Sequence, residues 1–443
     1  MPDKTSILHL TPHLNGGLGK VLLLQAECSQ TNHHICLFEK SISDYKFFNT
    51  EIICKIFDLN DNTHALLSAY DVVQVEYWNH PLIYELLLRG TLDNVNCLVG
   101  CAHIQGDKAP QLISKGAIKY VDRMLITGQW LTKSLSDDDL LKKIEFVRYP
   151  IEIKKFSKSN HLNLQASKSR LTACYVGTVS YSKLSREFFS IIESCYSYID
   201  FIIVGDPDDE IIADSRARSS NLSFIGKTDD VIPYLSVSDL FFYPLRKGHY
   251  GTGELALVEA MSFSLPIVAF DNEAESSLII NNQTGILCST LSEFISALSS
   301  LAANKALRER LGMTAREYIE SNYSHEAFEI FAKSFYENIY STSARTKYSV
   351  FMKEELQSLS IGAKCFIQSL EGMDDTCHHV MQSMIRVMNN SDSYYDRKSI
   401  AVFFRDYPEY RYKSKGGFFH YLYCFPGDRS LNMLSNYASG LHE

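Results

Sequence analysis

The sequence predicts an α/β chain made of two doubly wound parallel sheets, followed by an α-rich extension. A chain of 443 residues is longer than a single hydrophobic core usually supports. Short apolar runs alternate with longer amphipathic segments, which is the pattern of βαβ units. The alternation stops at the polar stretch 157–169 and then restarts. We therefore predict domains at residues 1–165 and 166–342, an interdomain cleft at the carboxyl ends of the strands, and an extension of unknown role at 343–443.

Six apolar runs in the first domain predict buried strands, and two amphipathic segments between them predict helices. The strands are expected at 7–10, 34–38, 71–75, 96–100, 123–127 and 144–147, and the helices at 18–28 and 81–89.

The second domain repeats this order. Strands are expected at 171–176, 201–204, 222–225, 240–243, 266–270 and 285–287, and helices at 291–301, 305–321 and 326–339. In the extension, residues 350–388 have a helical pattern. The stretch 394–425 is crowded with Tyr and Phe among the basic residues Arg397, Lys398, Arg405, Arg411, Lys413 and Lys415. This stretch predicts either a packed subdomain or oligomer contact, or a surface that rests on anionic lipid headgroups.

Composition narrows the class of protein. A net charge of −9 argues against general nucleic-acid binding. Eleven cysteines without a CxxC pair indicate reduced thiols. No apolar run approaches the roughly 18 residues that span a bilayer, and the N-terminus lacks the pattern of a signal peptide. We expect a cytoplasmic protein, with a peripheral contact to the inner membrane surface.

A glycine-rich turn after the run 240–243 is the most informative motif. Gly251, Thr252 and Gly253 lead into a helix that opens with Glu254 and contains Glu259. Backbone N–H groups of such a turn, helped by the helix dipole, bind phosphate. A carboxylate inside the helix can accept hydrogen bonds from vicinal hydroxyls, so the pair suits a nucleotide sugar. The alternative is an amphipathic helix with two solvated acids.

Two further candidates lie in the first domain. Gly16 and Gly17 follow the first run and let the backbone approach a phosphate or a sugar, with Lys20 nearby, although neither a P-loop nor a GxGxxG pattern is present. A plain tight turn is the alternative. His103 follows the run 96–100 and is expected to contact a sugar or act in catalysis as a hydrogen-bond donor; a satisfied surface histidine is the alternative.

Strand ends of the second domain carry the remaining candidates. Gly177 and Thr178 follow its first run, and Lys183 is expected where the next helix begins, where it would neutralise a leaving diphosphate. A solvated lysine is the alternative. Gly205 and Gly226 lie in the next two turns, which line a base pocket or are ordinary loops.

A metal site is not expected from the sequence. The run Cys377-His378-His379 offers ligand types, but no second cluster supports it.

Together these residues resemble retaining glycosyltransferases of the GT-B fold, specifically glycosyltransferase family 4 of the bacterial surface-polysaccharide type. The resemblance covers about residues 5–342 and implies two Rossmann-like domains. Its elements are Gly16-Gly17-Leu-Gly19, His103, Gly177 with Lys183, Val204-Gly-Asp206, Gly226, Glu259-Ala-Met261 with Leu265-Pro-Ile-Val268, Asn281-x-x-Thr-Gly285, and the helical segment from Leu307 to Tyr323-Ser324.

The resemblance also implies roles for individual residues. Glu259 matches the acid that binds the nucleotide ribose, while the acid that contacts the donor sugar falls at Gly251, with Glu254 the nearest substitute. Thr178 stands where arginine is usual, and Lys183 keeps its place. His103, Lys183 and Glu254 are then the catalytic residues. Donor contacts would come from the glycines at 16, 17, 177, 205, 226, 251 and 253, with Thr178, Thr252, Lys183, Glu254 and Glu259.

The activity implied is metal-independent hexosyl transfer without a cofactor. A sugar would move with retention from a UDP- or GDP-sugar to a glycan or lipid-linked acceptor in bacterial polysaccharide or lipopolysaccharide synthesis. The alternative is a catalytically impaired GT-B scaffold subunit that binds a glycan or a partner enzyme. A phosphorylase fits less well because no pyridoxal lysine is identifiable, and a sugar-nucleotide epimerase fits less well because the helix pattern resembles that of family 4. The sequence does not predict an oligomeric state.

Overall fold

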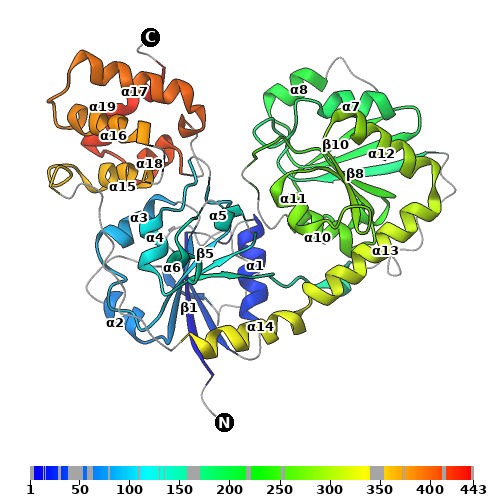
Figure 1. Ribbon diagram of the computed structural model, residues 1–443, viewed down its shortest axis with the longest axis horizontal. Coiled ribbons are helices and arrows are strands. Elements are labelled where there is room, and N and C mark those ends of the chain that lie inside the picture. The colour runs from blue at the N-terminus through cyan, green and yellow to red at the C-terminus, as the bar shows by residue number, and fades with distance from the viewer. Residues whose placement is uncertain are drawn as a thin grey trace. The chain divides into compact units, whose positions relative to one another are not determined.

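The computed structural model forms two compact units (Figure 1). It describes residues 4–12, 14, 16–27, 31–37, 53–56, 63–77, 80–107, 110–128, 130–133, 135–156, 170–215, 221–249, 251, 255–339, 354–371, 373, 375–411 and 416–440. One unit is Met1–Val147 with Phe331–Glu443, and the other is Arg148–Ile330. These units do not coincide with the three predicted segments. The extension belongs to the first unit because its helices pack on the helix at Pro81–Leu88, which lies in that unit. Helix α14 (His325–Asn338) is divided between the two units.

The first unit contains a seven-stranded parallel sheet in the order β3-β2-β1-β4-β5-β6-β7. Its strands are β1 (Ser6–Thr11), β2 (Asn32–Leu37), β3 (Ile53–Ile56), β4 (Val72–Tyr77), β5 (Leu98–Ala102), β6 (Arg123–Ile126) and β7 (Ile144–Phe146). Six of them match predicted runs, and β3 is the one that the sequence analysis missed. The strand order reverses between β1 and β4, which is where ligands of doubly wound sheets bind.

The second unit contains a six-stranded parallel sheet in the order β10-β9-β8-β11-β12-β13. Its strands are β8 (Leu171–Val176), β9 (Ile199–Val204), β10 (Leu222–Gly226), β11 (Leu240–Tyr243), β12 (Ile267–Phe270) and β13 (Gly285–Cys288). All six were predicted, because strands buried on both faces appear as continuous apolar runs. The order reverses between β8 and β11.

Helices cover both sheets. In the first unit they are α1 (Gly16–Ala26), α2 (Thr63–Ser68), α3 (Pro81–Leu88), α4 (Lys115–Tyr120), α5 (Trp130–Lys133) and α6 (Asp138–Leu141). In the second they are η1 (Ile153–Lys155), α7 (Phe188–Cys195), α8 (Asp209–Ser215), α9 (Ile232–Ser236), α10 (Leu255–Ser262), α11 (Glu273–Leu278), α12 (Leu291–Ala303) and α13 (Lys305–Asn322). Within the described residues, none of the helices is both long and apolar enough to cross a bilayer.

The extension is helical, as expected, and Figure 1 shows it as the orange to red part of the ribbon. Its elements are α15 (Ile361–Ser369), α16 (Asp375–Met388), α17 (Tyr394–Asp406), η3 (Pro408–Arg411), α18 (Phe418–Cys424) and α19 (Arg429–Ala438). Phe366 lies 5.1 Å from Phe418, 5.3 Å from Tyr421 and 6.4 Å from Tyr410 between ring centroids. Part of the aromatic content of 394–425 therefore forms a core, and α15 and α18 pack on α3.

Candidate functional site

A buried carboxylate, Glu76, organises the polar centre of the first unit. Glu76 lies at the carboxyl end of β4, between β1 and β5. Its Oε1 accepts a hydrogen bond from His9 Nδ1 at 2.8 Å and from Gln74 Nε2 at 3.1 Å, and its Oε2 accepts from His103 Nε2 at 2.5 Å. The side chains of Glu76 and His9 are fully buried, whereas that of His103 is 13% exposed. His103 is therefore the member of this pair of imidazoles that reaches the surface of its unit.

The hydrogen bonds continue inward from His9. His9 Nε2 lies 2.8 Å from His33 Nδ1, and Thr31 Oγ1 lies 2.5 Å from His33 Nε2. One set of tautomers satisfies every contact: Thr31 donates to His33, His33 donates through Nδ1 to His9, and His9 donates through Nδ1 to Glu76. His103 then donates through Nε2 to the same carboxylate. This arrangement fixes the orientation of the His103 ring.

The electrostatics of the network favour an ionised Glu76. Burial favours the neutral carboxyl, but hydrogen bonds from His103 and His9, and attraction to these rings when protonated, outweigh burial and lower the pKa of Glu76 from 4.5 to about 2. Burial, together with repulsion from His9 and His34, holds the pKa of His33 well below its usual range despite the attraction of Glu76. The network thus contains one buried negative charge next to His103.

The sequence analysis identified His103 and missed Glu76 and His9. Their signal was present in the runs Leu8-His-Leu10 and Val72-Val-Gln-Val-Glu76, where polar residues interrupt buried strands. A buried charged group is costly unless it is paired, so such interruptions point to a functional or structural network.

The glycine loop after β1 is described in part. Gly16 and Gly17 lie in the first turn of α1, two residues before the predicted start of that helix, and Lys20 is exposed. A Cβ on Gly19 would lie 1.7 Å from the carbonyl oxygen of Leu14. The glycine at 19 is therefore required by the close approach of α1 to the preceding loop.

Three predicted glycines meet in the second unit, at the carboxyl ends of β8, β9 and β10. Gly205 N donates to Gly226 O at 2.9 Å, and a Cβ on Gly205 would lie 2.0 Å from the carbonyl oxygen of Gly177. Gly205 has a φ of +143°, which favours glycine. Thr178, next to Gly177, is exposed. The structure thus brings Gly177, Gly205 and Gly226 together.

Lys183 lies in a turn, and the prediction that it sits at the start of the next helix is wrong. Helix α7 begins at Phe188. The turn that contains Ser182 and Lys183 is instead hydrogen-bonded to the residues that follow β11. Arg246 N donates to Lys183 O at 2.9 Å, and Arg246 Nε donates to Ser182 O at 2.7 Å. Lys183 Nζ lies 5.7 Å from the ring centroid of Tyr243, within reach of a cation–π interaction. Lys183 is therefore positioned beside the strand that leads into the glycine-rich turn.

A buried pair, His249 and Glu275, holds Gly251 at the start of the glycine-rich turn, and the sequence analysis did not identify it. His249 Nε2 lies 3.1 Å from both carboxylate oxygens of Glu275 on α11, and both side chains are fully buried. Gly251 N donates to His249 Nδ1 at 3.0 Å. Asn272 Nδ2 donates to Glu275 Oε1 at 3.2 Å and to Leu245 O at 3.4 Å. The N–H of Gly251 therefore points inward, toward His249.

Glu259 is 5% exposed on α10. A solvated acid, the alternative considered for this residue, does not describe it. The predicted site residues Thr252, Gly253 and Glu254 lie outside the described residues.

The run Cys377-His378-His379 lies on α16. Cys377 is buried on α16, whereas His378 and His379 are exposed, so that run does not converge. Among the described residues, Glu76, Cys101 and His103 lie close enough to share an ion. Both oxygens of Glu76 already accept hydrogen bonds from ring or amide N–H groups, which makes the group a carboxylate–imidazole pair rather than a ligand set.

The extension carries a basic cavity of about 700 Å³. Arg397, Lys398, Arg405 and Arg411 line it, together with Tyr394 and Tyr437. Arg397 pairs with Asp392 and Arg405 with Asp406, each across an exposed contact. Tyr394, Tyr395 and Tyr423 are 71%, 76% and 76% exposed. Basic and aromatic side chains thus lie together on the surface of the extension.

Part of the second unit is similar in sequence to known glycosyltransferases. Residues 171–304 match the family described as Glycosyl transferases group 1. A segment of 71 residues is 35% identical to the Xenopus tropicalis protein named Glycosyltransferase 1 domain-containing protein 1. The match covers 16% of this chain and 21% of that protein, so it spans about a fifth of the relative.

Solved structures match most of the chain at low identity. Anabaena Alr3699/HepE in complex with UDP has a TM-score of 0.62 and 12% identity, over 76% of this chain and all of that one. Sucrose-phosphate synthase from Thermosynechococcus elongatus has a TM-score of 0.59 and 16% identity, over 77% and 100%. The lipopolysaccharide outer core galactosyltransferase WaaB has a TM-score of 0.54 and 15% identity, over 75% and 100%. The chain therefore has the two-domain GT-B fold with a helical C-terminus, and a segment of its second domain is similar to the group 1 glycosyltransferase family.

Proposed function

We propose that the protein transfers a sugar from a nucleotide-sugar donor to a glycan or lipid-linked acceptor, with retention at the anomeric carbon. One observation carries the proposal. Within the segment that matches the group 1 family, the Gly177, Gly205 and Gly226 turns meet at the carboxyl ends of three neighbouring strands, the usual position for a nucleotide. The UDP and UDP-glucose complexes of Alr3699/HepE support a nucleotide-sugar donor.

Each donor contact has an expected role. Lys183 would neutralise charge that develops on the leaving diphosphate, the largest single contribution in reactions of this kind. Glu259 would accept hydrogen bonds from the ribose hydroxyls. Glu254, with Thr252 and Gly253, stays a proposed donor contact.

His103 is proposed to contact the donor sugar. Its Nε2 contacts Glu76 Oε2, so a contact with the sugar would have to come from another atom of the ring. A neutral ring that donates through Nε2 can only accept a hydrogen bond through Nδ1, whereas a doubly protonated ring can donate one there.

The test combines a binding screen with matched variants. Nucleotide sugars that bind the native state raise its melting temperature, and the best of them is then used for turnover. Lys183→Ala and Glu259→Gln should each lower turnover by on the order of 100-fold or more. Lys305→Ala and Glu309→Gln, on the exposed face of α13, are the controls and should leave turnover unchanged. Unchanged turnover in Lys183→Ala and Glu259→Gln removes the site assignment.

A second candidate is a scaffold that binds a nucleotide or glycan without turnover. Two departures from the family pattern favour it: Gly251 occupies the position of the first acid, and Thr178 that of arginine. Its signature is donor binding, in the same screen, that is not followed by release of nucleotide diphosphate with any acceptor.

The basic cavity of the extension supports an anionic acceptor. We propose that phosphate groups of a lipid-linked acceptor, or of the membrane that holds it, contact Arg397, Lys398 and Arg411, with Tyr394 and Tyr423 at the lipid interface. Deletion of the extension would uncover the face of α3 on which it packs, so charge reversal is the cleaner test. Lys398→Glu with Arg411→Glu should lower co-sedimentation with vesicles that contain anionic phospholipid. Equal sedimentation of variant and wild type contradicts the membrane contact.

A further inference from the structure

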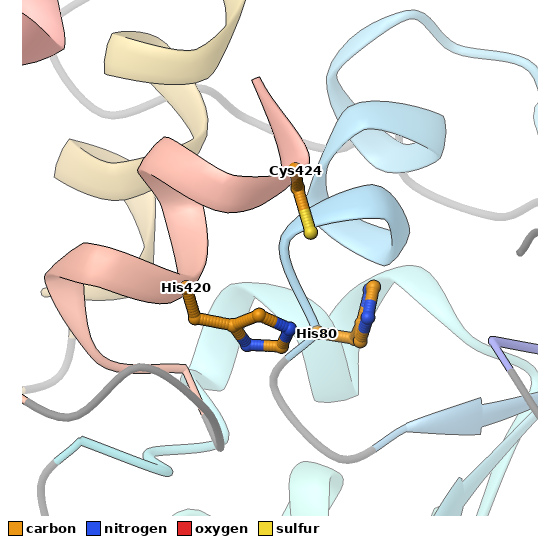
Figure 2. A group of neighbouring side chains, drawn as sticks. All are labelled: His80, His420 and Cys424. Carbon is orange, nitrogen blue, oxygen red and sulfur yellow. The ribbon is translucent and has the colours of Figure 1, made fainter. Parts of the chain in front are cut away.

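Three potential metal ligands from distant parts of the chain lie together in the first unit. His80 immediately precedes α3, while His420 and Cys424 lie one turn apart on α18. Figure 2 shows the three side chains grouped between these two helices, and one ligand atom from each lies within 4.8 Å of the other two. Residues at i and i+4 share a helix face, which explains why α18 presents both of its ligands toward His80.

The composition and burial of this group suit a borderline-soft cation. His80 is 1% exposed, His420 is 8% exposed, and Cys424 is half-buried. The two imidazole rings meet edge to face at 4.6 Å between centroids. Imidazole nitrogen and thiolate sulfur are ligand types that zinc prefers, whereas Mg²⁺ and Ca²⁺ prefer oxygen.

The geometry requires only small movements. Zn–N distances of about 2.0–2.1 Å and Zn–S distances of about 2.3 Å place tetrahedral ligands roughly 3.3–3.6 Å apart. Atoms within 4.8 Å of one another reach that spacing by side-chain rotations of about 1 Å. The extension already packs on α3 here, so no helix has to move.

The present hydrogen bonds define which ring atom would bind. His80 Nδ1 accepts from Leu82 N at 3.2 Å, and His420 Nδ1 accepts from Gly416 N at 3.2 Å. A metal would therefore be held through Nε2, with the ring proton moved to Nδ1, and both of these hydrogen bonds would be lost because each Nδ1 would then be a donor. Two neutral hydrogen bonds are weak beside the free energy of a structural zinc site, so the exchange favours the metal.

We propose that His80, His420 and Cys424 bind one zinc ion, with water as the fourth ligand, and that the ion fastens α18 to α3. The role is structural and is separate from sugar transfer. Because His80 follows Glu76 by four residues in the β4–α3 connection, the same ion would restrain the chain that carries the Glu76 network.

The experiment uses the full-length chain without a histidine tag. The protein is stripped with a chelator, kept reduced, and titrated with Zn²⁺ against a chromophoric competitor. We expect a 1:1 complex whose affinity falls by on the order of 100-fold or more in His420→Gln and Cys424→Ser. His379→Gln, exposed on α16, is the control and should bind as wild type does. Absence of 1:1 binding, or equal affinity in the two ligand variants, overturns the proposal.

A second measurement needs no variant, so it tests the proposal even if the ligand variants do not fold. Co²⁺ replaces Zn²⁺ in the wild-type chain, and a thiolate–cobalt charge-transfer absorption is expected, because Cys424 supplies sulfur to the ion. A 1:1 cobalt complex without that absorption overturns the proposal by itself. Neither measurement depends on glycosyltransferase activity.

Discussion

Substitution of Glu76 by glutamine tests the network that holds His103. A pKa lowered from 4.5 to about 2 corresponds to about 3 kcal/mol in favour of the ionised, hydrogen-bonded carboxyl. Glutamine has nearly the same shape but no charge, and its NH₂ group faces an N–H donor of His9, Gln74 or His103. We expect Glu76→Gln to lose about 3 kcal/mol of unfolding free energy near pH 7.

The stability lost in Glu76→Gln should depend on pH in a defined direction. The native pKa of Glu76 is depressed, so its stabilisation is fully present above the unfolded pKa and is lost as the pH falls through the native one. The difference between wild type and Glu76→Gln should therefore shrink from about 3 kcal/mol at pH 6 to about 1 kcal/mol at pH 3.

The assay can be restricted to the unit that contains the network. Both tryptophans of the sequence, at positions 78 and 130, fall within the range 1–147 assigned to the first unit and none falls in the range of the second, so tryptophan fluorescence during urea unfolding is the readout for the first unit. Glu145→Gln, an exposed carboxylate on β7 of the same sheet, is the control and should be nearly neutral. A Glu76→Gln difference that is absent, or that stays constant between pH 6 and pH 3, refutes the reasoning.

Three further predictions concern individual contacts. Tyr336→Phe removes the hydrogen bond to Gln74 Oε1 at 2.6 Å and should cost about 1 kcal/mol of first-unit stability in the same assay, whereas Tyr395→Phe, exposed on α17, should cost nothing measurable. Glu275→Gln should lower the donor affinity measured by calorimetry, because it weakens the contact to His249, which holds the backbone N–H of Gly251. Unchanged affinity would contradict a role for that turn. Gly205→Ala should destabilise the second unit and abolish donor binding, since its Cβ would meet the Gly177 carbonyl; a variant with wild-type affinity would show that the turns can separate.

The sequence was sufficient for most of the fold. Buried parallel strands are continuous apolar runs, so twelve of the thirteen strands among the described residues were predicted, and their alternation with helices predicted parallel sheets. The missed strand, β3, is the short Ile53-Cys-Lys-Ile56 at a sheet edge, where the apolar signal is weakest. Local patterns also indicated the helices of the extension.

Only the tertiary structure decided which side chains meet. His9 and Glu76 lie on β1 and β4, and His103 directly follows β5, so their pairing depends on strand order and register, which no local pattern contains. Lys183 was expected at a helix start, but long-range hydrogen bonds from Arg246 hold it beside β11. In the same way, His80 joins His420 and Cys424 because α18 packs on α3, a contact between segments more than 300 residues apart. Local propensity determines elements, whereas the burial of charge and apolar surface determines their partners.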